Sequence, residues 1–506
     1  MAIKKYFASK DNTITNAFKD NLITRATGSN MGASDILEAF VIHGQTSGSI
    51  SAGNAEQSRI ILEFPVSSIT ADMSSGVLPS STGSVQFYLN LYNAPHGSTL
   101  PKDFNLNISA VAKYWEEDVC MLSQSWSEGT GLDMDNYTDI GTSNWVKNSS
   151  DSFWGRQGGS FLEGENTSGS AYFPDGLESI SLDVSEMVYK WLDTTNNYGF
   201  LVKFPDSVVS GSDTNYTKKF FGRGSEFYFC RPTLESRWDS TRKDNRGSFY
   251  VSSSLATSDD NLNTLYLYNV IRGQLSNIPN LTNNALNVQI FSSSLGPSGS
   301  ALTMVDSDGN SGTSVVGGIL VENGATITGV YTASFASTHT FEPMCDVWST
   351  GSGASRIEFF TGSFSPQYVQ TSEVSYGREY ITNITNLHSS YMKGQKPQLR
   401  VFSRDKNWSP NIYTVATQEI IPEIIEDAYY RVVRTIDNLE IIPFGTGSNN
   451  NNFTRLSYDV SGNYFDLDTS CLQPGYSYGI QFLYYLEGSY KEQPNIFKFR
   501  IEEEEV

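Results

Sequence analysis

The chain has 506 residues, more than one hydrophobic core ordinarily holds, and typical domain sizes predict about three domains. Its 34 Lys and Arg residues against 55 Asp and Glu residues give a net charge of -21. A surface this acidic repels nucleic acid and anionic membranes, so neither is an expected partner. No run approaches the ~20 apolar residues that cross a bilayer, and MAIKKYFASKDN lacks the apolar stretch of a signal peptide. We therefore expect synthesis in the cytosol without membrane insertion.

The composition favours strands over helices. The chain contains 28 Tyr, 29 Phe and 42 Gly residues, and Asn, Ser and Thr crowd the gaps between apolar runs. Aromatic and β-branched residues suit half-buried pleated surfaces, whereas Gly, Asn and Ser suit turns. The predicted fold class is all-β, with tandem β-sandwich domains. The cysteines lie far apart without metal-type spacing, and we interpret them as small buried apolar residues; they are Cys120, Cys230, Cys345 and Cys471.

Residues 1–235 predict the first sandwich. Short apolar runs at Ser58–Phe64, Ser84–Tyr92 and Gly199–Phe204 are separated by Gly, Ser, Pro and Asn, a spacing typical of strands and turns. Leu182–Leu192 is the exception, because its apolar residues recur at helical spacing behind Asp183, a suitable N-cap. The sequence therefore predicts one short helix across an end of the sandwich.

Several segments of this region follow one another in a recognisable order. They are SRIILEFPV, LNLYNAPHG, NISAVAKYWEEDVC, NWV, LDVSEMVYKWL, NYGFLVKF and EFYFCRPTLE. This order resembles the DNRLRE-type β-sandwich domain, a relative of carbohydrate-binding modules in large surface and structural proteins. The departures are a long Gly/Asn/Ser-rich insert at Ser123–Ser170 and a weaker opening before Ile36, and they leave a ligand-binding role of the loops open.

The most basic part of the chain is the junction Arg231–Tyr250 (RPTLESRWDSTRKDNRGSFY). Acidic residues dominate on both sides of it. The junction could pack between domains or onto an acidic neighbour, and the alternative is a solvated linker.

Two further sandwiches are predicted after the junction. Residues 236–370 favour an immunoglobulin-like sandwich, and residues 371–506 favour an immunoglobulin- or fibronectin III-like one that ends in an acidic tip, Glu502–Glu505. Within the last region, Leu472–Tyr478 (LQPGYSY) resembles the tyrosine corner of such domains. There a Tyr hydroxyl bonds back across the turn, which is a structural role.

Nearly the whole chain also resembles the virion structural proteins of contractile-tailed marine bacteriophages of the cyanophage and pelagiphage kind. The segments that carry this resemblance are NTITNAFKDNLITRATGSNMGASDILEAF, RPTLESRWDS with KDNRGSFY, and TRLSYDVSGNYFDLD with PGYSYGI. The resemblance implies a place in the virion, assembled in the host cytoplasm, with other virion proteins as partners and a homo-oligomer within the particle. A tail, baseplate or fibre-attachment position is the first expectation, and neck or head decoration is the alternative.

Motifs of catalysis are missing from the sequence. It has 4 histidines, and no HExxH helix, GxSxG elbow or phosphate-cradling Gly-rich loop occurs. The consecutive acids Glu116, Glu117 and Asp118 cannot by themselves supply two carboxyl groups facing each other across a sugar. We expect no catalytic residues and no enzyme.

Two acidic clusters offer hard oxygen ligands for a structural Ca²⁺, the only cofactor considered. They are Asp306, Asp308 and Asn310 in VDSDGNSG, and Asp133, Asp135 and Asp139 in GLDMDNYTD. Neither has the twelve-residue loop with a closing Glu, and an Asp-Gly-Asn run between strands equally favours a hairpin turn.

Aromatic residues gather in or near the long insert: Trp126, Tyr137, Trp145, Phe153 and Trp154. A Gly/Ser/Asn-rich loop does not obviously require them for a core. Exposed rings could stack on the sugars of a host-surface glycan, or they could bury themselves against a neighbouring subunit. A carbohydrate-binding or adhesin role is therefore the alternative to the structural one.

Overall fold

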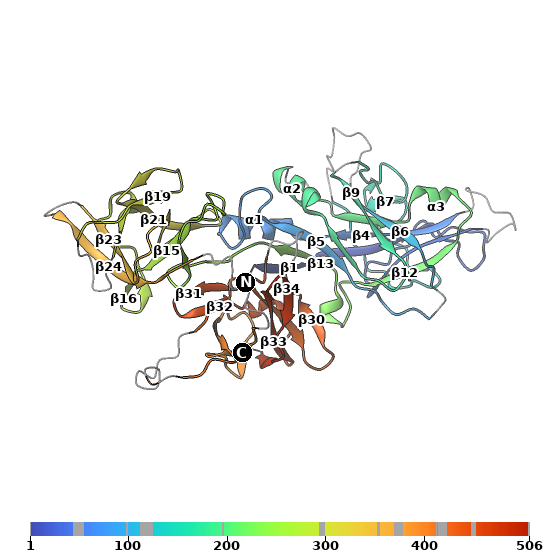
Figure 1. The fold of residues 1–506 in the computed structure, drawn as a ribbon. Helices are drawn as coiled ribbons and strands as arrows, with labels where there is room; N and C mark the ends of the chain where they lie inside the picture. Colours follow the sequence, from blue (N-terminus) through green and yellow to red (C-terminus); the bar gives the residue numbers. More distant parts are fainter. Residues whose placement is uncertain are drawn as a thin grey trace. The chain divides into compact units, whose positions relative to one another are not determined.

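The computed structural model contains two compact units, Ile3–Trp238 (the N-terminal unit) and Asp239–Val506 (the C-terminal unit) (Figure 1). Both consist mainly of antiparallel sheets, which confirms the predicted all-β class. The structure describes residues 2–43, 55–97, 100–111, 125–164, 166–194, 197–292, 299–351, 355–368, 378–410, 412, 422–446 and 452–503. None of the helices within these ranges is long and apolar enough to cross a membrane.

The N-terminal unit has two main sheets, with the orders β1-β13-β5-β10 and β12-β3-β4-β11-β6-β9, and β2 also pairs with β4. Its strands are β1 (Ile3–Phe7), β2 (Lys10–Thr15), β3 (Ile36–Ile42), β4 (Glu56–Glu63), β5 (Gln86–Leu91), β6 (Phe104–Ala110), β7 (Lys147–Ser149), β8 (Ser152–Phe153), β9 (Ser168–Phe173), β10 (Ile180–Asp183), β11 (Phe200–Lys203), β12 (Asn215–Phe221) and β13 (Thr233–Arg237). Its helices are α1 (Val66–Ser74), α2 (Ser185–Thr194) and α3 (Asp206–Ser210), with a 3-10 turn at Tyr228–Cys230. The three runs predicted as strands correspond to β4, β5 and β11, which confirms them.

Strands β4 and β11 are buried on both faces. Successive side chains of a strand point to opposite faces, yet Ile60 and Ile61 of β4 are both 0% exposed, as are Leu201 and Val202 of β11. A strand covered on one face alone would alternate between apolar and polar residues. A second layer therefore packs on the large sheet at these strands.

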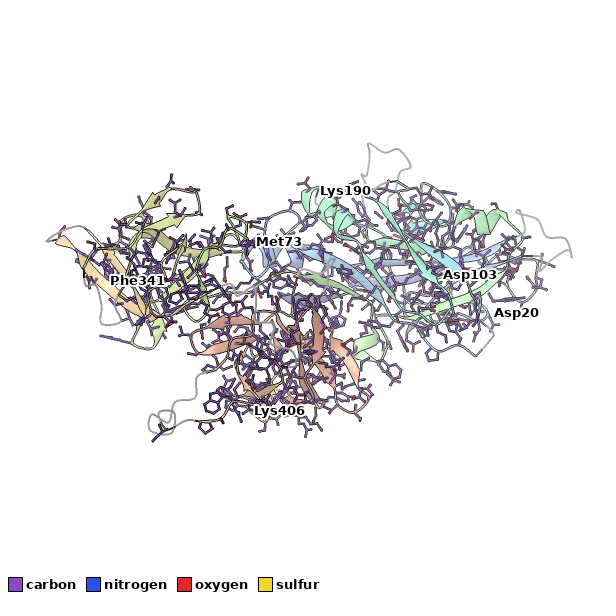
Figure 2. All side chains as sticks on the ribbon, viewed as in Figure 1. Asp20, Met73, Asp103, Lys190, Phe341 and Lys406 are labelled. Atoms are coloured by element: carbon purple, nitrogen blue, oxygen red, sulfur yellow. The ribbon has the colours of Figure 1, made fainter. Side chains whose placement is uncertain are left out.

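The predicted helix is α2, and it begins at Ser185. Oδ1 of Asp183 accepts a hydrogen bond from the backbone N of Ser185 at 2.9 Å, so the carboxylate caps the first turn from just outside it. Val188 and Trp191 are buried, whereas Lys190 is exposed (Figure 2). This confirms the amphipathic pattern.

The C-terminal unit contains two sets of strands that pair only within their own set among the described residues. The first set is β14 (Phe249–Tyr250), β15 (Asn263–Tyr268), β16 (Val270–Ile271), β17 (Gln274–Leu275), β18 (Leu286–Phe291), β19 (Met304–Asp306), β20 (Ser311–Gly312), β21 (Val315–Glu322), β22 (Ala325–Ala336), β23 (Met344–Thr350), β24 (Ile357–Phe364) and β25 (Pro366–Gln367). The second set is β26 (Tyr380–Ile384), β27 (Ser390–Met392), β28 (Gln398–Asp405), β29 (Ala428–Arg434), β30 (Leu439–Ile442), β31 (Ser457–Asp459), β32 (Gly462–Asp466), β33 (Ser477–Leu486), β34 (Ser489–Glu492) and β35 (Phe497–Glu502). Short 3-10 turns lie at Thr282–Asn284 and Thr469–Cys471. The boundary predicted near residue 370 falls at 369–377, outside the described residues.

In the first set, β15 joins a sheet of order β20-β19-β22-β21-β18-β23-β24 by pairing with β22. The second set forms two sheets, β26-β28-β32-β31 and β27-β35-β33-β29-β30, with β34 on β33. The tyrosine corner predicted there is present. The hydroxyl of Tyr478 donates to the carbonyl oxygen of Gln473 at 2.8 Å and accepts from its backbone N at 3.0 Å. This confirms a sandwich with the corner typical of immunoglobulin-like domains.

The basic junction is not a solvated linker from Arg242 onward. Arg242 makes two bonds of 2.5 and 2.6 Å to the carboxylate of Glu322 on β21, and its carbonyl oxygen accepts from the backbone N of Tyr458 on β31 at 3.0 Å. Arg246 is buried and pairs with Asp346 on β23 at 2.7 Å. These partners belong to both strand sets, so this part of the junction packs against acidic residues within the C-terminal unit. Its packing onto an acidic neighbour is the predicted alternative that fits.

Candidate functional site

The structure buries the tryptophans that the sequence offered as a ligand platform. Trp126, Trp145 and Trp154 are 1%, 5% and 5% exposed. The indole N–H of Trp154 donates to the carbonyl oxygen of Asn144 at 2.8 Å, and that of Trp126 to the carbonyl oxygen of Tyr198 at 3.0 Å. The prediction of exposed rings is wrong for these three residues, because they are the second layer on the large sheet. The cluster, here called the insert core, contains Ile14, Ile61, Val111, Trp126, Trp145, Trp154, Phe161 and Leu201.

The other two aromatic candidates, Phe153 and Tyr137, are not part of the insert core. Phe153 is 59% exposed, with the ammonium of Lys147 at 5.2 Å from its ring centre, and Tyr137 is half-buried. The five residues therefore do not share one exposed face. The sequence held a signal for the insert core: the unbroken apolar runs of β4 and β11 require a cover on both faces, and the insert supplies the nearest unassigned large side chains.

The aspartates Asp306 and Asp133 of the two acidic clusters accept hydrogen bonds from the backbone of their own turns. Oδ1 of Asp306 accepts from the backbone N of Asp308 at 3.0 Å and of Asn310 at 2.8 Å, within the β19–β20 hairpin. Asp133 similarly accepts from the hydroxyl of Thr138 at 2.6 Å and from the backbone N of Asp135 at 3.0 Å. The hydroxyl bond is the main reason why the pKa of Asp133 is lowered, and the backbone bond adds to it. Such bonds are those of Asx turns. No group of three or more His, Cys, Asp or Glu side chains is placed for a metal in the part of the chain that the structure describes, so the Ca²⁺ site stays a prediction.

The consecutive acids Glu116–Asp118 lie outside the described residues, as does Cys120. Cys345 and Cys471 are buried, as predicted, whereas Cys230 is half-buried.

A buried carboxyl group of the N-terminal unit has a strongly raised pKa. Asp11 on β2 is 1% exposed, and its Oδ2 accepts from the backbone N of Arg223 at 2.6 Å. Glu128 lies beside it and binds the Arg223 guanidinium at 2.5 Å. Burial raises the pKa of Asp11 to about 7, with the Glu128 charge acting in the same direction.

This shift predicts that the stability of the N-terminal unit falls as pH rises from about 4 to about 7. In that window the folded state retains a proton on Asp11 that the unfolded chain has already lost, so the folded state binds more protons. Asp11→Asn keeps the acceptor for Arg223 but cannot ionise, and we expect it to remove up to a few kcal/mol of this pH dependence. The measurement is urea unfolding at pH 5 and pH 8, with Asp308→Asn, an exposed turn residue, as the control. If the free energy of unfolding changed equally between pH 5 and pH 8 in Asp11→Asn and in the unmodified protein, the raised pKa of Asp11 would be contradicted.

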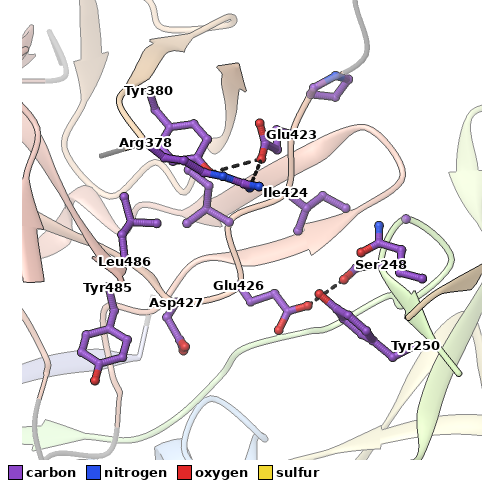
Figure 3. Close-up of a pocket in the computed structure, with 14 residues that line it drawn as sticks. Ser248, Tyr250, Arg378, Tyr380, Glu423, Ile424, Glu426, Asp427, Tyr485 and Leu486 are labelled. Carbon is purple, nitrogen blue, oxygen red and sulfur yellow. Dashed lines mark hydrogen bonds and ion pairs between the residues drawn. The ribbon is translucent and has the colours of Figure 1, made fainter. Parts of the chain in front are cut away.

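The C-terminal unit contains a pocket of about 500 Å³ (Figure 3). Tyr250 of β14, the start of β26, the segment 422–427 that precedes β29, and the end of β33 line it. We call it the 423–427 pocket. It was not predicted from the sequence, because its walls come from separate segments between Gly247 and Leu486 that only the fold brings together.

Two polar clusters lie on different walls of this pocket. In one, Oε1 of Glu423 accepts from the guanidinium of Arg378 at 3.3 Å and from the hydroxyl of Tyr380 at 3.1 Å. In the other, Oε1 of Glu426 accepts from the hydroxyl of Ser248 at 2.6 Å, beside Tyr250 (Figure 3). Ile424 lies on the segment between the two carboxylates. The pocket therefore combines donors, acceptors and apolar surface.

Hydrogen bonds fix the backbone of the lining segment. Asn463 holds Ile425 on both sides, accepting from its N at 2.9 Å and donating to its carbonyl oxygen at 2.8 Å. The backbone N of Glu423 donates to the carbonyl oxygen of Ser403 at 2.8 Å, and that of Tyr485 to the carbonyl oxygen of Asp427 at 2.9 Å. The carboxylates thus project from a segment that is anchored at both ends, which is the behaviour of a pre-formed site.

A scan against protein-family models found no match, and a search of curated proteins found none. Among solved structures the chain is similar to the tandem Ig repeats of Dlar, with 10% identity and a TM-score of 0.13, over 37% of this chain and 75% of that chain. A superposition this loose carries no argument. The assignment of the fold as all-β sandwiches rests on the strand pairing and the tyrosine corner of the chain itself.

Proposed function

We propose that the protein is a non-enzymatic structural component of a tailed-phage virion, in its tail, baseplate or fibre-attachment region, and that it acts through protein–protein interfaces. The resemblance of the N-terminal, junction and C-terminal segments to phage virion proteins supports the location. The tandem sandwiches and the charge of -21 are compatible with a soluble building block. Neck or head decoration remains the alternative position.

The observation that carries the interface role is the edge strand β24. Among the described strands it pairs only with β23, yet Ile357 and Phe359 are 59% and 38% exposed. The hairpin β16–β17 adds Val270, Ile271 and Leu275, each about half exposed. An apolar edge with unpaired backbone groups is an aggregation hazard in an isolated domain. Cover by a neighbouring subunit removes that hazard.

The glycan-binding alternative loses its original support, because three of its five aromatic residues are in the insert core. A specific observation favours it elsewhere: the 423–427 pocket combines tyrosines, carboxylates and a guanidinium.

Immunogold electron microscopy of intact particles, with antibody against the purified protein, tests the virion proposal. Gold at the tail tip, baseplate or fibre attachment is the expected result. Label on the head or neck would favour decoration, and particles that lack the protein altogether would refute the virion role.

Phe359→Lys is expected to lower the amount of the protein in purified particles by about tenfold or more, because a charge buried at an interface costs well over the ~1.4 kcal/mol of one decade. The readout is quantitative mass spectrometry of particles in which the variant replaces the natural chain. Ile436→Lys is the matched control, since Ile436 is 77% exposed in the turn between β29 and β30. Normal incorporation of Phe359→Lys would exclude β24 as an assembly edge.

A further inference from the structure

We infer that the 423–427 pocket is a binding site for a neutral saccharide of one or two pyranose rings. The inference goes beyond the structural role and is independent of it, because a virion protein can assemble normally whether or not this pocket is occupied.

The chemistry of the lining fits the two faces of a sugar. A pyranose presents hydroxyl groups around its rim, each of which donates and accepts, and apolar C–H groups on its faces. Glu423 and Glu426 are acceptors, the Arg378 guanidinium is a donor, and the tyrosine rings and Ile424 offer apolar surface. Donors and acceptors occur together on two walls, so hydroxyl groups at opposite sides of one ring can be bound at the same time.

The charge of the lining selects against acidic sugars. Glu423, Glu426 and Asp427 line the pocket together with one guanidinium, that of Arg378. Arg455 neutralises Asp427 from outside the lining, at 2.6 Å. A uronate or sialate would add a negative charge beside Glu423 and Glu426. Like charges in contact across a pocket of this size repel strongly where water is partly excluded.

The size and rigidity of the pocket set the length of the ligand. At about 500 Å³ it lies in the lower half of the ~300–1,000 Å³ range of small-molecule sites, which suits a mono- or disaccharide or the end of a longer chain. The bonds of Asn463 to Ile425 fix the carboxylates before binding. Little conformational freedom of this segment is then lost when a ligand enters.

The test is saturation-transfer difference NMR on the full-length protein with five neutral disaccharides: maltose, cellobiose, lactose, mannobiose and N,N′-diacetylchitobiose. Digalacturonate serves as the acidic counterpart. We expect transfer to at least one neutral disaccharide, none to digalacturonate, and a loss of affinity of about tenfold or more in both Glu423→Ala and Glu426→Ala. Glu440→Ala, on β30 and outside the pocket, is the control and is expected to bind normally.

Three outcomes would overturn the inference: no transfer to any neutral disaccharide, unchanged affinity in both pocket variants, or equal binding of digalacturonate. Because Glu423 is 36% exposed at its side chain, its removal leaves the core intact, and an unchanged thermal unfolding curve verifies this. Immunogold labelling of particles is read separately, so failure of the saccharide site does not count against the virion role.

Discussion

Trp154→Ala is expected to lower the free energy of unfolding of the N-terminal unit by about 3–5 kcal/mol. The indole is 5% exposed and packs in the insert core with Ile61 of β4 and Leu201 of β11. Its removal leaves a cavity against these strands. The carbonyl oxygen of Asn144 also loses the hydrogen bond that the indole N–H donates to it. Native-state hydrogen exchange read by mass spectrometry measures the effect, since it reports the opening free energy of peptides from β4 and β11 separately from the rest of the chain.

The neighbouring residue provides the control for this prediction. Phe153 is 59% exposed, so Phe153→Ala is expected to change the same opening free energies by less than about 0.5 kcal/mol. If the two variants were equally stable, the tryptophan would not be part of a core, and its ring would again be available to a ligand.

Arg246→Met is expected to destabilise the first strand set of the C-terminal unit by about 3–5 kcal/mol. The carboxylate of Asp346 on β23 is 0% exposed and binds Arg246 at 2.7 Å and the indole N–H of Trp348 at 2.8 Å. Without the guanidinium, this buried carboxylate loses its strongest compensating charge. The measurement is again the opening free energy of β23 peptides in hydrogen exchange.

A second substitution tests whether the charge of Asp346 causes the loss of stability in Arg246→Met. Arg246 also pairs with the buried Asp244 at 3.3 Å, the longer of its two ion pairs. Asp346→Asn, added to Arg246→Met, removes the charge of the closer carboxylate while the amide oxygen still accepts from Trp348, so we expect it to recover about half of the loss. Lys102→Met is the comparison at the surface. Lys102 pairs with Asp175 at 3.0 Å, the two side chains are 68% and 67% exposed, and such pairs contribute about 0–1 kcal/mol. A double variant no more stable than Arg246→Met would show that packing, not charge, dominates at this site.

The features that could be predicted from the sequence are local ones. The amphipathic spacing of α2, the turn chemistry of the tyrosine corner and the apolar runs of β4, β5 and β11 each depend on residues close together in the chain. Their physical causes, side-chain periodicity and turn geometry, act over a few residues. The all-β class follows from the accumulation of such signals.

The features that were missed depend on distant partners. Trp126 and Trp154 lie in a loop-like composition, and only the sheet beneath them makes them a core. For the segment with Arg242 and Arg246 the sequence left a packed and a solvated state open, and only the fold decides between them by bringing Glu322 and Asp346 to it. The 423–427 pocket depends on separate stretches near Tyr250, Tyr380, Glu423 and Tyr485 that the fold alone brings together, so no single stretch carried a sign of it.

The pairing of β1 with β13 has a consequence for how the chain can be rearranged. Ile3 and Arg237 are opposite each other in an antiparallel ladder, where paired Cα atoms lie about 4.5–5.5 Å apart. The first and last strands of the N-terminal unit therefore bring its two chain ends close together. Such a module can be excised, transplanted into a surface loop of another protein, or circularly permuted with a short linker between its ends, without strain on its own sheets.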